Sequence, residues 1–165
     1  MDRASMQAWP AEKGGSMTLS ELNARLAPAG LSRAWVDPIF RISTSLIFII
    51  GGIGHFLAHD HMLERMAESP WRGVLSYLGD PSWMLWLSGA VFLVFGFTLA
   101  LGYLTRISAL LIIVTLIPVT IAVHVAPGHA GPFFKNIAIM GALLYFYVKG
   151  PGRFAFDEPG TRNYR

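Results

Sequence analysis

The chain has 165 residues, of which 53% are hydrophobic and only 14% are charged, whereas soluble domains carry about 25% charged residues. It is therefore too apolar for an ordinary soluble enzyme, and it is too short to hold a soluble catalytic domain beside a membrane part. Its net charge of +3 is not gathered into one basic patch, so no nucleic-acid partner is expected. The sequence contains no cysteine, which excludes disulfides, thiolate nucleophiles and cysteine-bound zinc or iron–sulfur clusters.

The amino-terminal segment, residues 1–38, carries charged residues throughout and no long apolar run. We therefore expect no cleavable signal peptide there, and the first spanning helix is expected to direct insertion itself. Thr18 followed by Glu21 has the spacing of a capping box, in which each residue satisfies a backbone N–H of the other. This pair predicts a short amphipathic helix within the segment.

Four later segments have the length and hydropathy of membrane-spanning helices, which need roughly 20 mostly apolar residues. They extend from about Ile39 to Ala58, Trp83 to Gly102, Ile107 to Val125 and Phe133 to Lys149. Small residues recur in them, and small residues let membrane helices approach closely. The sequence thus predicts an all-α integral membrane four-helix bundle over residues 39–149, surrounded by lipid bilayer and followed by a tail at residues 150–165.

The distribution of Lys and Arg predicts the orientation of the bundle. Of the 13 basic residues, only Arg65, Arg72 and Lys135 lie in or beside the first and third loops, and the others lie in or beside the amino-terminal segment, the second loop and the tail. Basic segments stay on the cytoplasmic side of a membrane. Both termini are therefore predicted to be cytoplasmic.

Two features shape the predicted outer end of the bundle. In the first loop, residues 59–82, apolar and charged residues are interleaved, which predicts amphipathic turns on the outer surface. In the third span, Pro118 has no N–H to donate and is expected to bend the helix. Thr115 and Thr120 are expected to satisfy the backbone groups that the proline frees.

All five histidines fall at this outer end in the predicted topology. His55 and His59 are four residues apart, a spacing that places two residues on one face of a continuous helix. Lys135 and Asn136 open the fourth span at the same end. Ionisable residues at membrane depth are functional suspects. The candidate site therefore includes this group of histidines, which are His55, His59, His61, His124 and His129.

The leading interpretation is a quinone or quinol headgroup site formed by His55, His124, Lys135 and Asn136. Histidine titrates near neutral pH, so it can exchange the protons that accompany electrons. The side chain of Lys135 or Asn136 is suited to holding a carbonyl oxygen of the headgroup. These four residues are the expected cofactor-binding set.

Three other interpretations stay open. His59, His61 and Glu64 offer nitrogen and oxygen ligands that suit zinc, copper or iron. The second alternative is a haem b held by two histidines between the first and third spans. His59 and His124 each follow an Arg-Ile-Ser sequence by 18 residues and are therefore predicted at matching depths. In the third, the histidines hold no cofactor and bond only to backbone, water and lipid headgroups.

Four motifs in this order resemble the DoxX family of small bacterial and archaeal membrane proteins, over about residues 39–157. They are Gly51-Gly52-Ile53-Gly54-His55-Phe56, Ala100-Leu101-Gly102-Tyr103-Leu104-Thr105-Arg106, Phe133-Phe134-Lys135-Asn136-Ile137-Ala138 and Gly150-Pro151-Gly152-Arg153-Phe154-Ala155-Phe156-Asp157.

The resemblance implies a multi-pass protein of the cytoplasmic (inner) membrane, associated with quinone-linked respiration, sulfur-compound oxidation or oxidative-stress complexes. His55, Lys135 and Asn136 fall in the family-like motifs, whereas His59 and His61 do not. The expected function is a membrane subunit of a quinone-linked redox complex, receiving electrons from protein partners. If it has an activity, it is that of a quinone-coupled oxidoreductase subunit. The alternative is a non-catalytic accessory or assembly subunit of a larger membrane complex.

Overall fold

The computed structural model describes residues 17–26, 33–125 and 128–157, and within these ranges it is all helical, with no strand. Helix α1 (Leu19–Arg25) belongs to the amino-terminal unit, which is separate from the unit that holds the other helices. The predicted capping box is present at its start. The N–H of Glu21 donates to the Thr18 hydroxyl at 3.2 Å, and the N–H of Thr18 donates to the Glu21 carboxylate at 2.9 Å.

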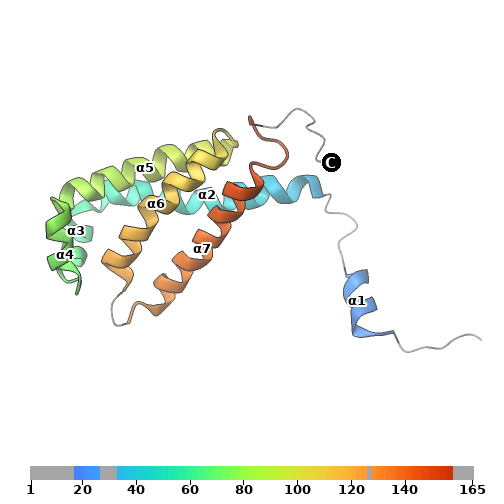
Figure 1. Ribbon diagram of the computed structural model, residues 1–165, viewed down its shortest axis with the longest axis horizontal. Coiled ribbons are helices and arrows are strands. Elements are labelled where there is room, and N and C mark those ends of the chain that lie inside the picture. Colours follow the sequence, from blue (N-terminus) through green and yellow to red (C-terminus); the bar gives the residue numbers. More distant parts are fainter. Residues whose placement is uncertain (1–16, 27–32, 126–127, 158–165) are drawn as a thin grey trace, which may run out of the picture. The chain divides into compact units, whose positions relative to one another are not determined.

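The four predicted spans correspond to long apolar helices, which confirms the predicted fold class (Figure 1). They are α2 (Arg33–Leu57), α5 (Pro81–Leu101), α6 (Thr105–His124) and α7 (Ala130–Lys149). Helix α2 begins at Arg33 rather than at Ile39. Pro38 is tolerated inside it because it lies close to the helix start, where its missing N–H removes only one of the first intrahelical hydrogen bonds.

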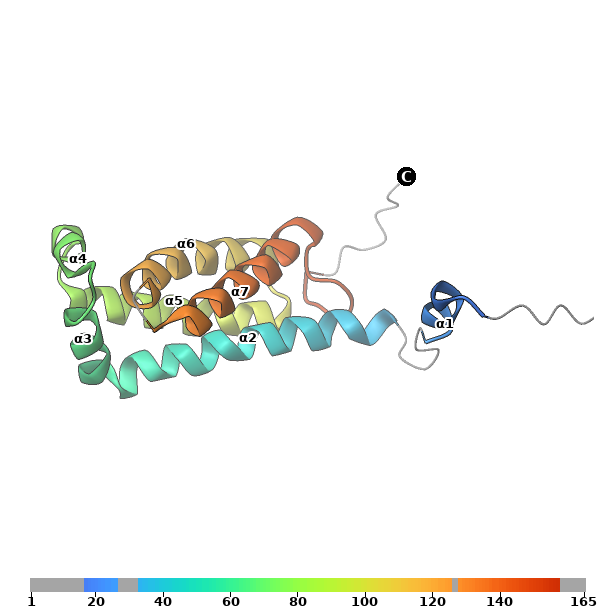
Figure 2. The same ribbon diagram turned by 90° about the horizontal axis from the view of Figure 1, so that it is seen from below.

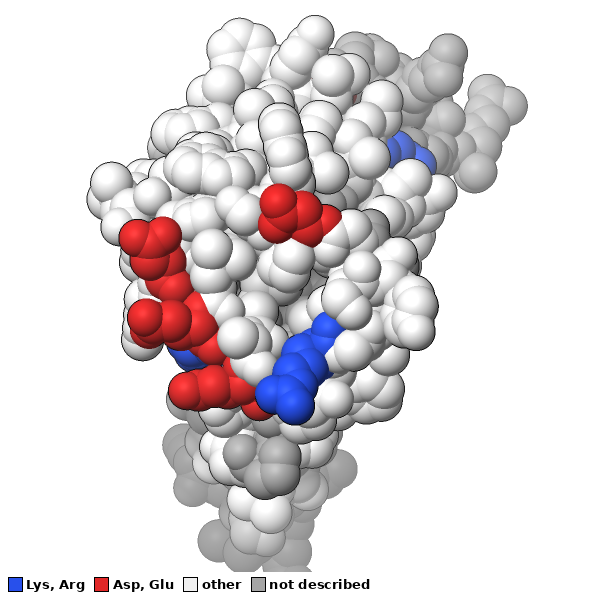
Figure 3. Space-filling model, turned by 90° about the vertical axis from the view of Figure 1, so that its left-hand side faces the viewer, with Lys and Arg blue, Asp and Glu red and all other residues white. Residues whose placement is uncertain are grey.

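The first loop folds into two short helices, α3 (His59–Ala67) and α4 (Arg72–Leu78), as the interleaved apolar and charged residues predicted. Helix α3 packs on α2, α5 and α6 and buries Met66. Figure 3 looks onto the end of the bundle that carries α3 and α4, where acidic and basic side chains are exposed. The exposed charged residues of this loop are Asp60, Glu64, Arg65, Glu68, Arg72 and Asp80.

The spanning helices pack as two hairpins. Helix α2 packs along α5, α6 packs along α7, and the hairpins meet mainly where α5 contacts α6, while α2 and α7 touch little (Figures 1 and 2). The α2–α5 contact is very close, because a Cβ atom at Gly52 would lie 2.9 Å from the carbonyl oxygen of Gly89. The hairpins lie together near the α5–α6 turn and diverge toward α3 and α4 (Figure 1).

The opposite end of the bundle is closed around the guanidinium of Arg41, a residue that is only 2% exposed. Its N–H groups donate to backbone carbonyls of Ala100 at 3.2 Å, Arg153 at 3.4 Å and Phe154 at 2.8 Å, and also to that of Pro151. Three of these four carbonyls belong to the segment that follows α7. The guanidinium therefore joins α2, the end of α5 and the carboxy-terminal segment.

Asp157 attaches the same segment to the α5–α6 turn. The N–H of Thr105, the first residue of α6, donates to the Asp157 carboxylate at 2.9 Å, and the N–H of Asp157 donates to the carbonyl of Gly102 at 2.9 Å. A carboxylate at a helix N-terminus also suits the helix dipole. Residues 150–157 are thus an ordered part of the bundle.

The predicted orientation can be tested by labelling, because the sequence contains no cysteine to interfere. Tyr77 on α4 is 92% exposed and Phe156 at the opposite end is 78% exposed. If both termini are cytoplasmic, a membrane-impermeant maleimide is expected to label Tyr77→Cys in right-side-out vesicles and Phe156→Cys only in inverted vesicles. The reverse pattern would place α3 and α4 in the cytoplasm.

Candidate functional site

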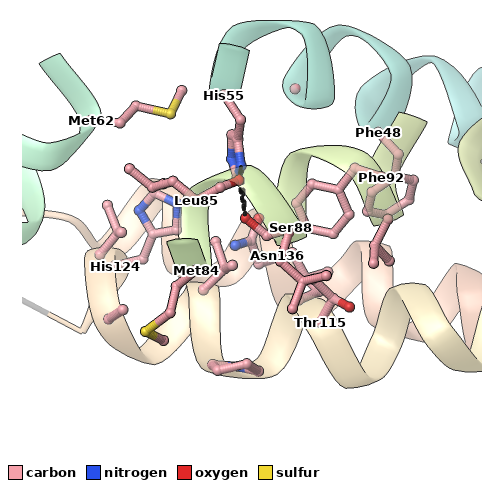
Figure 4. Close-up of a pocket in the computed structure, with 18 of the residues that line it drawn as sticks. Phe48, His55, Met62, Met84, Leu85, Ser88, Phe92, Thr115, His124 and Asn136 are labelled. Carbon is pink, nitrogen blue, oxygen red and sulfur yellow. Dashed lines mark hydrogen bonds between the residues drawn. The ribbon is translucent and has the colours of Figure 1, made fainter. Parts of the chain in front are cut away.

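A cavity of about 530 Å³ lies between the two hairpins at the end of the bundle that α3 covers. Helices α2, α3, α5, α6 and α7 all contribute to its walls, and most of the lining side chains are apolar (Figure 4). The polar and charged residues that line it are His55, Arg65, Ser88, Thr115, His124, Lys135 and Asn136. All four residues of the predicted quinone set are among them. The structure therefore brings these four residues, from three helices, around one space.

His55 is buried and its ring is held by α5. Its Nδ1 lies 2.8 Å from the Ser88 hydroxyl and 3.3 Å from the carbonyl oxygen of Leu85 (Figure 4). The Ser88 hydroxyl itself donates to Leu85 at 3.0 Å, so its oxygen is free to accept from His55. Both neighbours of Nδ1 thus act as acceptors, which assigns the proton of the neutral ring to Nδ1 and leaves Nε2 able to accept one.

Asn136 is buried on the α7 side of the cavity. Its amide nitrogen donates to the Thr120 hydroxyl at 2.9 Å, and that hydroxyl donates to the Leu116 carbonyl at 2.6 Å. This chain of hydrogen bonds fixes the rotamer of the amide across the α6–α7 contact. The amide is therefore a rigidly placed polar group in a mostly apolar wall.

His124, the last residue of α6, carries a buried ring nitrogen without a partner. Its Nδ1 forms no hydrogen bond within the part of the chain that the structure describes. The neighbouring His129 has a partner, because its Nδ1 lies 2.9 Å from the Val123 carbonyl. A buried polar atom left unpaired costs about 1–3 kcal/mol. A ligand in the cavity reaches this nitrogen only if the His124 side chain turns, because the atom has almost no accessible surface.

The residues proposed for a metal do not gather around a common point. His59 bonds to Ser82 through Nε2 at 3.1 Å and stacks on Trp86, while His61 lies on the surface, 3.8 Å from Glu64. Among the described residues, no three His, Asp or Glu side chains are placed to hold a metal ion. Neither His59 nor His61 lines the cavity.

The expectation that His55 and His59 share a helix face is wrong. Helix α2 ends at Leu57, and Ala58 has φ −116° and ψ 33°, which is not helical. His59 begins α3 and follows the new helix direction. The cavity does not pair the two histidines proposed for a haem, because His124 lines it and His59 does not.

The threonines near Pro118 have partners other than the predicted one. Pro118 cannot donate to the carbonyl of Val114, four residues earlier. The hydroxyl of Thr115 instead donates to Leu111 at 2.9 Å, and that of Thr120 donates to Leu116. Thr115 therefore lines the cavity with its hydroxyl proton already engaged in its own helix.

Several lining residues were not predicted from the sequence. Arg65 adds a second cation to the cavity besides Lys135, and Ser88 orients His55. Met62, Met66 and Met84 form flexible apolar walls near α3. Nothing in the sequence spacing of these residues marks a site.

Two comparisons with known proteins identify relatives of the chain. Residues 37–125 match the family model described as DoxX. The inner membrane protein YphA of Escherichia coli (strain K12) is 32% identical over 139 residues, which cover 78% of this chain and 93% of that protein. No solved structure matches the chain at a significant level.

These matches agree with the four apolar helices and confirm the expected multi-pass location in the inner membrane. The motifs after residue 125 lie beyond the matched part of the family model. The family model covers more than half of the chain, and the relative extends over most of it. The chain belongs to the DoxX family.

Proposed function

We propose that the protein is a membrane subunit of a quinone-linked redox complex and that its cavity receives the quinone headgroup. The observation that carries the proposal is the convergence of His55, His124, Lys135 and Asn136 on one apolar cavity among spanning helices. Small-molecule sites measure about 300–1,000 Å³ and combine apolar walls with a few placed polar groups. The cavity of about 530 Å³ fits this description.

The chemistry of the lining suits a flat apolar ring with two carbonyl oxygens. Phe48 and Phe92 supply aromatic wall, while Asn136 and Lys135 supply N–H donors. His124 contributes the buried nitrogen that has no protein partner among the described residues. A turn of the His124 side chain toward the cavity would let a ligand oxygen accept from this nitrogen and remove its desolvation cost. These features favour a quinone over a purely hydrocarbon ligand.

The histidines also suit the proton exchange of such a site. Reduction of a quinone to a quinol takes up two electrons, which a partner redox protein would supply, and two protons. His55 keeps its Nδ1 proton bonded to α5 and can take up or release a proton at Nε2. The neighbouring apolar side chains limit the access of bulk water.

The test is binding of menadione, a naphthoquinone without a tail, to the purified full-length protein in nanodiscs. Asn136→Leu keeps the side-chain volume and removes the amide, and is expected to weaken binding about tenfold, the effect of losing one hydrogen bond in an apolar site. Thr115→Val is the matched control, because its hydroxyl also lines the cavity but donates to Leu111. It is expected to change the affinity less than about twofold.

Equal affinities of the wild type and Asn136→Leu for menadione would mean that Asn136 does not bind the headgroup. The absence of menadione binding by the wild type would overturn the proposal. If a protein that binds no quinone still copurified with respiratory subunits, the accessory-subunit alternative would replace it. In membranes, Asn136→Leu is expected to slow quinone reduction while the copurifying proteins stay the same.

A further inference from the structure

The cavity is open to the side of the bundle between α5 and α6. Leu87 on α5 and Val114 on α6 both line the cavity, yet they are 66% and 58% exposed. A side chain that lines a cavity and is also exposed stands at an opening. With Val91 and Pro118, which also line the cavity, these residues form what we call the α5–α6 slot.

The slot opens at the depth of the lipid chains. Val114 lies near the middle of α6, about 14 Å from Thr105 and about 15 Å from His124 at 1.5 Å per residue. The hydrocarbon core of a bilayer is about 30 Å thick, so the middle of a spanning helix faces acyl chains rather than water. All four side chains of the slot are apolar.

The hydroxyls of Ser88 and Thr115, on the slot helices, already donate to the backbone of their own helices, and the other polar groups of the cavity lie away from the slot. Lys135 and Asn136 are on α7 and His55 is on α2, whereas the slot is formed by α5 and α6. The cavity is also open beside α2, where Ile47 lines it and is 44% exposed, but α2 also carries the imidazole of His55. A ligand with one polar and one apolar end therefore fits the cavity with its polar end toward α7 and its apolar end toward the slot.

We infer that the α5–α6 slot is the passage for the isoprenoid tail of a membrane quinone, which enters sideways from the bilayer and leaves its tail in the lipid. The inference rests on the proposed function and specifies the ligand as a long-chain, lipid-dissolved quinone. The headgroup then lies toward α7, and the tail passes between Leu87 and Val114.

The experiment compares menaquinone-4, which has a tail, with menadione, which has none, by equilibrium binding to the full-length protein in nanodiscs. Val114→Trp places a large ring across the slot and is expected to weaken menaquinone-4 binding about tenfold, because the tail loses its apolar contacts and its way out. Menadione binding is expected to stay within about twofold, which also shows that the variant is folded. Ile117→Trp is the control, since Ile117 is 44% exposed on the same helix but does not line the cavity.

Each outcome separates the two proposals. If Val114→Trp leaves menaquinone-4 binding unchanged, or weakens both ligands equally, the slot is not the tail passage, while the headgroup site stands. If Ile47→Trp rather than Val114→Trp weakens menaquinone-4 binding selectively, the tail leaves beside α2 and the inference is overturned. If the wild type binds neither quinone, the proposed function fails and this inference fails with it.

Discussion

Replacement of Arg41 by methionine is expected to lower the free energy of unfolding by about 3 kcal/mol, because each buried carbonyl left without a donor costs about 1–3 kcal/mol. Methionine keeps a long unbranched side chain but removes every N–H that now bonds to Ala100, Pro151, Arg153 and Phe154. Removal of the buried charge offsets part of this loss, which is why the expected value is below the sum over the carbonyls.

The measurement is unfolding of the purified protein in mixed micelles, followed by circular dichroism. Arg106→Met is the control, since Arg106 is exposed beside the same turn, and its change is expected to stay below about 0.5 kcal/mol. A second readout is tryptic cleavage after Arg153, which is expected to accelerate in Arg41→Met only. Equal stability of the two variants would mean that Arg41 does not hold the carboxy-terminal segment.

Adjacent glycines of α2 are expected to respond very differently to alanine. A Cβ atom at Gly52 would lie 2.8 Å from Cγ of Leu93 and 2.9 Å from the Gly89 carbonyl oxygen, so α2 and α5 would have to separate. Overpacking of this kind costs about 1–3 kcal/mol. At Gly51 a Cβ atom meets nothing within 4 Å, and Gly51→Ala is expected to be neutral or slightly stabilising.

The same contact connects packing to the candidate site. A Cβ atom at Gly89 would lie 2.8 Å from Cβ of His55, so Gly89→Ala is expected both to destabilise the protein and to displace the imidazole from Ser88. Unfolding midpoints for Gly51→Ala, Gly52→Ala and Gly89→Ala test the packing, and menadione affinity tests the displacement. Similar midpoints for all three variants would contradict the close α2–α5 contact.

The number and approximate positions of the spans follow from the sequence because the bilayer imposes a length on every helix that crosses it. Local signals set their ends, as Asp80 and Pro81 do at the start of α5 and Gly102, with φ 68°, does at its end. The same constraint brought His55, His124, Lys135 and Asn136 to one end of the bundle. Hydropathy alone was therefore enough to group the candidate residues.

Contacts that depend on how helices rotate against each other were not predicted. Ser88 meets His55 only because Gly52 and Gly89 bring α2 and α5 together in one register. In the sequence, Arg41 resembles the other basic residues that are predicted to keep a segment in the cytoplasm. Its burial was not predicted because it depends on where the chain turns after α7. The prediction from the spacing of His55 and His59 was wrong because Ala58, between them, is not helical, so the two residues do not belong to one continuous helix.

The carbonyls around Arg41 have a further consequence for biosynthesis. Arg41 is synthesised early in translation, and Phe154, whose carbonyl it contacts in the folded protein, follows it by 113 residues in the sequence. Until the ribosome has delivered that stretch, a cation inserted with the first helix lacks three of its four final acceptors. Native assembly thus waits for the end of translation, and a product cut short before residue 151 would present an incompletely paired arginine to the quality-control proteases of the membrane.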